Sequence, residues 1–534
     1  MPQFASLSLR MLALAVFALR LSVTNAQIIK TTPTLQVVVN PNVLPSTVQG
    51  AGALAALDSL SPEFPRFVPW FPYPRLAVAE LEPPTGTSTS WNFTLIDPFV
   101  INFLNATVGR KPVINFSTIP AWMFKTDTPV TYPDDPNAVD FGYTQGTELV
   151  DPTGQQIADY YERLVSWYTL GGFTDELGVQ HTSGYHFDIP FWEVLNEVDS
   201  EHSTTPEDYT LRYDAIVSGI LKASPTTQFV GLAMAQASRL EYYEYFLNAS
   251  NHQPGIPLDY ISYHFYSQPG GNQSAEQWQT TFFADGASFI STVKSIETIR
   301  NNLSPGTKSM LNELGVILPN DNDANRPPIP ENYWNAAGAL YAYLYVELAR
   351  LGLDGTAGES QLVGYITQFP SVTEIDYNTG APNARFRVLE LLVKNIGPGD
   401  VIVQPEASIA LPDAVVSLTY TRGGVQKVIL INEHLNATSV TVPGATGGGL
   451  QTVDLLSAGG AIRQEQLSSD TVLLGGFADA LLFSYSFLSS FWIVRDNRES
   501  RTLKSYQVSF MTSDKHFIGQ DYEDPSPNDG ENPV

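Results

Sequence analysis

The stretch FWEVLNE, residues Phe191–Glu197, is apolar and aromatic at first and then ends in Asn-Glu. This pattern is typical of a buried β-strand that presents polar side chains at its carboxyl end. A second stretch of this kind, KSMLNE at Lys308–Glu313, ends in a glutamate 116 residues further on (313 − 197 = 116). Two strands that each end in a glutamate predict a site built on a pair of carboxyl groups.

The composition predicts a globular chain with a large core. The chain has 534 residues, of which 43% are hydrophobic and 16% are charged, and this length is enough for one large domain and a smaller one. The net charge of −27 would repel a phosphate backbone, so we expect no nucleic-acid binding. The absence of cysteine excludes disulfides, thiol nucleophiles and Cys-ligated metal sites.

The N-terminus predicts secretion. An apolar run, Met11–Leu21, follows a single basic residue and leads to Thr24–Ala26, which is the order of parts in a signal peptide cleaved after Ala26. We therefore expect residues 1–26 to be removed and the protein to be extracellular; the alternative is a buried N-terminal helix. Glycosylation sequons agree with secretion and begin at Asn92, Asn105, Asn115, Asn248, Asn272, Asn302 and Asn436. Asn115 lies in an apolar run, where we do not expect a glycan.

Strand and helix patterns alternate through residues 27–396. The strand candidates are short apolar runs, as parallel strands buried on both faces should be. They are Leu35–Val39, Arg66–Trp70, Pro112–Ser117, Pro190–Asn196, Gln228–Ala233, Leu258–Phe265, Lys308–Glu313 and Leu362–Phe369. Eight such units predict an α/β fold, a (β/α)₈ TIM barrel. An open doubly wound sheet is the alternative, but no Gly-rich phosphate loop follows an early strand.

A different pattern covers residues 397–485. Short alternating strands with Gly-rich turns predict a small antiparallel β-sandwich. Its strand candidates are Val401–Val403, Val415–Tyr420, Lys427–Asn432, Ser439–Val442, Thr452–Leu455 and Val472–Leu474. Residues 486–534 are charged and rich in Pro and Asp, which predicts a disordered tail or an incorrect gene model. The apolar stretch Val472–Val494 leaves a C-terminal membrane anchor as an alternative, although we do not expect membrane attachment.

The barrel would place the two glutamates at one site. Residues at the carboxyl ends of barrel strands face the active site, and Glu197 ends the fourth strand while Glu313 ends the seventh. Glu193 alternates onto the same face as Glu197 but lies deeper, so we expect it to support the site through hydrogen bonds. Hydrolysis of a glycosidic bond needs such a pair, with retention of configuration at a carboxyl separation of ~5–5.5 Å and inversion at ~6.5–9.5 Å.

A family resemblance agrees with this chemistry. WEVLNE, at Trp192–Glu197, resembles the acid/base strand of the clan A glycoside hydrolases, in which Asn-Glu closes strand four and a second Glu closes strand seven. The residues that follow, Val198–Asp199 with Pro206–Tyr209, are most similar to glycoside hydrolase family 39, which includes β-xylosidases and α-L-iduronidases. Asn115–Pro120 resembles the third-strand segment of that family, and Leu311–Glu313 resembles its nucleophile strand more loosely.

The resemblance covers about residues 35–396 and implies roles for three side chains. Glu197 would be the general acid/base, Glu313 the nucleophile of a retaining double displacement, and Asn196 a ligand of the sugar 2-hydroxyl. The chain departs from the family pattern in three places, which bear on the identity of the sugar. Val198 stands where Pro is usual, Asn312 stands where Thr is common, and Gln368-Phe369 stands where a Trp is expected in the eighth strand.

Further residues are candidates for substrate contact. His264 and Tyr266 end the sixth strand, so one of them should reach the rim and hydrogen-bond Glu313. Aromatic faces pack against sugar rings, so tryptophans that follow predicted strands are candidate platforms, with ordinary packing as the alternative. These tryptophans are Trp70, Trp122 and Trp334.

The expected substrate is an oligosaccharide or glycoside, and no metal or organic cofactor is implied. Two other functions stay open at this point. One is a carbohydrate-binding or cell-surface protein that kept the barrel without the activity, because a fold does not by itself imply function. The other is a glycanase from a different family of clan A.

Overall fold

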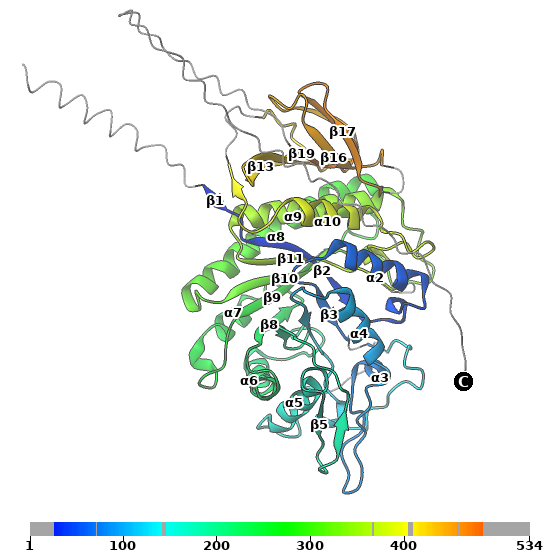
Figure 1. Ribbon diagram of the computed structural model, residues 1–534, viewed down its shortest axis with the longest axis vertical. Coiled ribbons are helices and arrows are strands. Elements are labelled where there is room, and N and C mark those ends of the chain that lie inside the picture. The colour runs from blue at the N-terminus through cyan, green and yellow to red at the C-terminus, as the bar shows by residue number, and fades with distance from the viewer. Residues whose placement is uncertain are drawn as a thin grey trace, which may run out of the picture. The chain divides into compact units, whose positions relative to one another are not determined.

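The computed structural model describes residues 26–70, 72–140, 146–365, 368–403, 409–457 and 460–483. Its centre is a closed barrel of eight parallel strands, and several of these strands are labelled in Figure 1. In barrel order they are β2 (Thr31–Val38), β3 (Arg66–Val68), β4 (Val113–Ile114), β7 (Phe191–Glu193), β8 (Gln228–Met234), β9 (Tyr260–Ser267), β10 (Lys308–Val316) and β11 (Gly355–Glu359). The predicted TIM barrel is confirmed, and its fourth and seventh strands, β7 and β10, are those that carry the two glutamates.

Helices connect the strands, and local sequence explains where they begin. They are α2 (Val48–Leu60), α3 (Pro74–Ala77), α4 (Asp97–Ala106), α5 (Gln155–Thr169), α6 (Pro206–Ala223), α7 (Leu240–Phe246), α8 (Ala275–Leu303), α9 (Asn332–Leu351) and α10 (Ala384–Asn395). At the start of α6, the Thr205 side chain accepts the Asp208 N–H, and Pro206 fits the first turn. Among the described residues, no helix is long and apolar enough to cross a membrane.

The eighth strand differs from the prediction. It is β11, Gly355–Glu359, whereas the described part of Leu362–Phe369 contains no strand. The sequence Gly-Thr-Ala-Gly lacks the bulky apolar residues that indicate a strand, because the backbones here pack too closely for them. A Cβ on Gly355 would lie 1.6 Å from the Ser309 carbonyl oxygen of β10. The apolar side chains of Leu362 and Val363 are buried in a loop instead.

Strand β7 is shorter than predicted. It ends at Glu193, and the chain then takes left-handed backbone angles at Leu195 (φ 64°) and Glu197 (φ 42°). Hydrogen bonds from Val194 N to Val230 O (2.9 Å) and from Glu197 N to Ala233 O (2.8 Å) hold this irregular segment against β8. Strict alternation therefore stops at Glu193. Glu193 and Glu197 do not follow one strand face, which corrects the sequence prediction.

The C-terminal strands form a seven-stranded sheet and a two-stranded sheet, as expected for a β-sandwich. The large sheet is antiparallel, in the order β1 (Gln27–Ile28), β12 (Val401–Ile402), β13 (Val415–Arg422), β14 (Val425–Asn432), β19 (Asp479–Phe483), β16 (Gly449–Val453) and β17 (Arg463–Gln466). The small sheet pairs β15 (Thr438–Thr441) with β18 (Thr471–Leu474). Each of the six predicted strands overlaps one of these.

Three features of this region bear on the sequence analysis. Strand β17 was not predicted, because its sequence Arg-Gln-Glu-Gln is polar and mostly exposed. The apolar stretch Val472–Val494, which left a membrane anchor as an alternative, begins within β18 and runs through β19, and its remainder lies outside the described residues. The predicted signal peptide, up to Asn25, and the predicted tail 486–534 also lie outside them.

Candidate active site

A buried arginine organises the carboxyl end of the barrel. Arg66, on β3, is 1% exposed and donates a hydrogen bond from Nε to Glu193 (2.5 Å). Its Nη1 donates to Gln36 (2.6 Å) and Glu313 (2.7 Å), and its Nη2 donates to the side-chain oxygen of Asn196 (2.6 Å). One guanidinium therefore fixes side chains from β2, β7 and β10 and from the segment that follows β7, because its planar fork presents several donors at once.

Glu193 lies at the centre of this network. Besides Arg66, its carboxylate accepts hydrogen bonds from the Asn115 amide (2.8 Å), the Ser262 hydroxyl (2.6 Å) and the Asn312 amide (2.6 Å). Both oxygens are thus occupied, and the side chain is buried. Glu193 supports the site, as expected. Asn115 is fully buried in the same network, where it has no room for a glycan.

Glu313 is held as a carboxylate. Tyr266 donates a hydrogen bond to Oε2 (2.8 Å), Arg66 donates to Oε1, and His264 Nδ1 lies 3.5 Å from Oε2. Burial alone would raise the pKa of Glu313, but the charges of His264 and Arg66 and the hydrogen bonds from Tyr266 and Arg66 lower it below the ordinary range. The side chain is only 9% exposed. It is therefore ionised and fixed in one orientation.

Glu197 is in a different environment. Its side chain is 22% exposed, and one oxygen lies 3.0 Å from Nδ1 of His264. Burial raises the pKa of Glu197, and although the bond to His264 opposes this, the charges of Glu313 and Asp199 add to the increase. The pKa values of the two glutamates are thus pushed apart, as expected where one carboxyl gives a proton and the other attacks.

The two glutamates lie close together across the barrel mouth. One atom each of Glu197, His264 and Glu313 lies within 4.8 Å of the other two. The two carboxyl groups therefore approach each other closely, as the pair of a retaining glycosidase must. The same three side chains have the spacing of a metal site, but Arg66 places a positive charge on Glu313 and would oppose a cation there.

A cavity of about 100 Å³ opens beside these residues. Its lining consists of Val38, Val68, Trp70, Asn196, Glu197, Glu201, Tyr266, Glu313, Ile317, Gln361, Phe369 and Val372. Of the tryptophan candidates, Trp70 belongs to this lining. Trp122 does not, and its indole donates to the Glu80 carbonyl (3.0 Å); Trp334 does not either, and lies on α9 against Tyr333. A sugar platform at Trp122 or Trp334 stays a prediction.

Three residues of the site, Arg66, Glu201 and Gln361, were not predicted from the sequence. A signal for Arg66 was present, because a charged side chain that begins a buried strand must find buried partners. Glu201 gave no such signal, since it follows the motif in a polar loop segment. Gln361 was missed because the eighth strand was placed too late. The position next to that strand's end is Ser360-Gln361 and not Gln368-Phe369, although Phe369 also lines the cavity.

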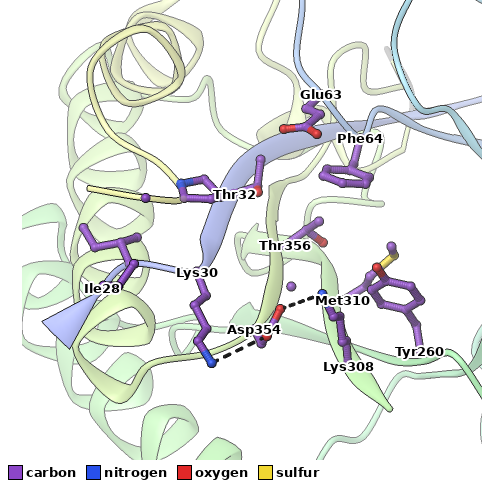
Figure 2. Close-up of a pocket in the computed structure, with 14 residues that line it drawn as sticks. Ile28, Lys30, Thr32, Glu63, Phe64, Tyr260, Lys308, Met310, Asp354 and Thr356 are labelled. Carbon is purple, nitrogen blue, oxygen red and sulfur yellow. Dashed lines mark ion pairs between the residues drawn. The ribbon is translucent and has the colours of Figure 1, made fainter. Parts of the chain in front are cut away.

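A second cavity, of about 390 Å³, lies at the amino ends of the barrel strands. Figure 2 shows that Lys30 and Lys308 both point toward Asp354 there. Their Nζ atoms lie 3.7 Å and 3.1 Å from its carboxylate. The active sites of TIM-barrel enzymes lie at the carboxyl ends of the strands, so the cavity beside Glu197 and Glu313 is the candidate active site.

Comparisons with known proteins agree with this fold. The sequence matches no family model, and no curated protein matches it either. Among solved structures, the chain is similar to a family 51 α-L-arabinofuranosidase from Bifidobacterium longum, with a TM-score of 0.58, 14% identity and coverage of 86% of this chain and 98% of that one. It is also similar to a GH30 endoxylanase from Clostridium papyrosolvens, with a TM-score of 0.52, 13% identity and the same coverage.

A third similar structure is a monomeric β-xylosidase from Caulobacter crescentus, with a TM-score of 0.51, 14% identity and coverage of 86% and 98%. Each of the three is described as an enzyme that cleaves glycosidic bonds. The first two belong to families 51 and 30, so the closer resemblance of this chain to family 39 stays a prediction. At these identities the likeness shows the fold, a TIM barrel followed by a β-sandwich.

Proposed function

We propose that the protein is a glycoside hydrolase that retains the configuration of the anomeric carbon. The observation that supports this most is the pair Glu197 and Glu313, whose atoms lie within 4.8 Å and whose pKa values are shifted in opposite directions. The acid and the nucleophile of a retaining glycosidase need this difference, on two carboxyl groups that lie close together.

The reaction would proceed in two steps. In the first, a Glu313 oxygen attacks the anomeric carbon while Glu197 donates its proton to the departing oxygen. In the second, Glu197 takes a proton from water, which attacks the same carbon and releases Glu313. Arg66 and Tyr266 hold Glu313 for the attack, and His264 lies between the two carboxyl groups.

Substrate contacts would come from the cavity lining. We assign Asn196 and Trp70 to the sugar, because both line the cavity beside the two glutamates. The sugar and the linkage are not fixed by this geometry, and family 39 remains a hypothesis based on the sequence motifs. We also propose an extracellular location, which rests on the N-terminal signal sequence and the sequons.

The test is hydrolysis of a panel of 4-nitrophenyl glycosides that includes α-L-arabinofuranoside, β-D-xyloside and β-D-glucoside. Glu313→Ala should abolish turnover with the fold intact by circular dichroism, whereas Glu148→Ala, at an exposed position, should change nothing. Glu197→Ala should slow substrates with poor leaving groups far more than activated ones, because only the former need the proton. Wild-type protein that binds sugars but hydrolyses none of the panel would favour the carbohydrate-binding alternative.

A further inference from the structure

Two buried polar atoms, both on residues that line the cavity, have no hydrogen-bond partner. They are Oε2 of Glu201 and Oε1 of Gln361. A buried polar atom without a partner costs roughly 1–3 kcal/mol, so such atoms are uncommon in native proteins and need a physical explanation. Their place in the lining beside Glu197 and Glu313 gives one, since a bound molecule could supply the missing partners.

The backbone that follows the motif turns Glu201 into the site. The carbonyl of Glu197 accepts the N–H groups of Ser200 (2.9 Å) and Glu201 (2.8 Å), which closes a tight turn. The other Glu201 oxygen accepts a hydrogen bond from the Trp70 indole (2.6 Å). The Asn196 side chain also interacts with the Glu201 carboxyl through a hydrogen bond, which lowers the pKa of Glu201 against the larger effect of burial. A third carboxyl group is thus fixed in the cavity by neighbours that themselves line it.

Gln361 is fixed by the segment that follows the eighth barrel strand. It follows the end of β11 by two residues, and its side chain is mostly buried, with the residue 7% exposed. Its backbone N–H donates to the Val372 carbonyl (2.9 Å), and its own carbonyl accepts the Glu374 N–H (3.1 Å). These two bonds anchor the backbone, so the amide is held in the lining without a partner for its oxygen.

The charges of the lining favour an uncharged molecule. The lining contains three carboxyl groups, on Glu197, Glu201 and Glu313, and neither lysine nor arginine. The nearby guanidinium of Arg66 already bonds four side chains. Burial raises the pKa of Glu201 well above its ordinary value, and the Glu197 charge adds to this, which favours the protonated form that can donate a hydrogen bond. A sugar hydroxyl can both accept and donate such bonds, whereas a sugar carboxylate has no proton to donate to the Gln361 oxygen and would lie beside the ionised Glu313.

We propose that Glu201 and Gln361 are specificity residues that bind hydroxyl groups of an uncharged sugar. In this arrangement, the Glu201 carboxyl donates to one hydroxyl and the Gln361 amide oxygen accepts from a hydroxyl. The inference rests on the proposed function, because it places the sugar beside Glu197 and Glu313. It adds the class of glycone, a neutral sugar and not a uronic acid.

The test measures binding separately from catalysis. Titration calorimetry with a Glu313→Gln parent would use methyl β-D-xyloside, methyl β-D-glucoside, methyl α-L-arabinofuranoside and methyl β-D-glucuronide. At least one uncharged glycoside should bind, and more tightly than the glucuronide. Adding Gln361→Ala or Glu201→Ala should weaken that binding about 10-fold or more, while Glu201→Gln, which keeps the shape and the polarity, should weaken it less.

Gln368→Ala is the matched control, because Gln368 also has a buried oxygen without a partner but does not line the cavity. Monodeoxy forms of the glycoside that binds then separate a contact from a packing effect. In the parent, one deoxy form should bind more weakly than the complete glycoside. In Gln361→Ala, the same deoxy form and the complete glycoside should bind almost equally, since that variant no longer makes the hydrogen bond. If the Glu201→Ala protein fails to fold, the affinities of Gln361→Ala and Glu201→Gln still test the inference.

Three results would overturn the inference. They are no binding of any uncharged glycoside to the parent, tighter binding of the glucuronide, and unchanged affinities in both substituted proteins. The last would mean that the bound glycoside does not reach these two atoms. Failure of the proposed function looks different, because there the wild type binds uncharged glycosides through these residues and hydrolyses none.

Discussion

Arg66 donates a hydrogen bond to Glu313 across 2.7 Å in the buried centre of the barrel. The same guanidinium bonds Glu193, so one cation compensates two buried carboxylates. The proposed nucleophile is therefore part of the structural core as well as of the active site. Its orientation and its charge both depend on a residue that does not line the cavity.

Replacing Arg66 should cost stability as well as activity. Arg66→Ala leaves Glu193 and Glu313 without their counter-charge, and we expect a loss of about 3–5 kcal/mol in the free energy of unfolding. Arg66→Lys keeps the charge but cannot reach four acceptors at once, so we expect a smaller loss of stability and a large loss of turnover. Urea denaturation followed by fluorescence measures the difference, with exposed Arg110→Ala as the control. Equal stability of Arg66→Ala and wild type would contradict the buried ion pair.

The pH profile of hydrolysis should be bell-shaped. Activity needs Glu313 ionised, and its lowered pKa keeps it so into the acid range. It also needs Glu197 protonated, and its raised pKa extends that form toward neutral pH. Activity should thus fall on the acid side as Glu313 gains a proton and on the alkaline side as Glu197 loses one. Measured with an activated aryl glycoside, Glu197→Gln should lose the alkaline limb and keep the acid one. An unchanged alkaline limb in that variant would assign it to another group.

Tyr266→Phe should shift one limb of that profile. The Tyr266 hydroxyl donates to Glu313 (2.8 Å), and this bond lowers the pKa of Glu313. Without it, the pKa should rise and the acid limb should move to higher pH. A hydrogen bond to a charged group is worth about 1.5–3 kcal/mol, so kcat/KM should fall roughly 10- to 100-fold. A uniform loss of rate with no movement of the limb would point to a role other than control of Glu313.

Gly355→Ala should prevent closure of the barrel. The added Cβ would lie 1.6 Å from the Ser309 carbonyl oxygen of the neighbouring strand, and neither backbone can move without breaking the ladder. We expect a loss of about 3 kcal/mol or more, seen as insoluble protein or a large drop in melting temperature. Gly306→Ala is the matched control, because a Cβ there would meet nothing within 4 Å. Similar melting temperatures for the two variants would mean that β10 and β11 are less closely packed than described.

Stability should decrease as pH rises toward 8, partly because of Glu80. This residue is fully buried with both carboxyl oxygens unpartnered, and burial, with the charges of Glu176 and Asp175, raises its pKa to about 8. The unfolded chain releases this proton near pH 4.5, so from there up to about pH 8 unfolding becomes steadily more favourable. Glu80→Gln should flatten this part of the curve of melting temperature against pH. An equal slope in both proteins would show that other groups carry it.

The sequence predicted those strands that are rich in bulky apolar residues. The strands before Glu193 and Glu313 are dense in apolar side chains, so their place in the barrel could be inferred from pattern alone. Strand β11 could not, because close packing against β10 selects glycine and alanine, which carry little strand signal. Leu362–Phe369 is apolar because a loop is buried there, and pattern alone does not separate these two causes of burial.

The sequence predicted only those parts of the candidate site that single side chains at strand ends can indicate. The nearness of Glu197 to Glu313 follows from their strands, but the turn that brings Glu201 back depends on left-handed backbone at Glu197, a residue type that rarely adopts it. Arg66 is linked to Asn196 and Glu313 across 130 and 247 residues of sequence. Such long-range partners cannot be assigned until the barrel order is known.

The pairing of β1 with β12 has a consequence for how the protein loses its structure. Gln27 lies opposite Ile402, 375 positions later (402 − 27 = 375), and Ile29 and Asp400 extend the contact through a 2.8 Å bond. The segment just before the first barrel strand is thus hydrogen-bonded to the segment just after the last barrel helix. Because the large sheet is incomplete without the first strand, barrel and sheet should melt together in one transition, and a protease that removes residues 27–30 should lower the melting temperature of both.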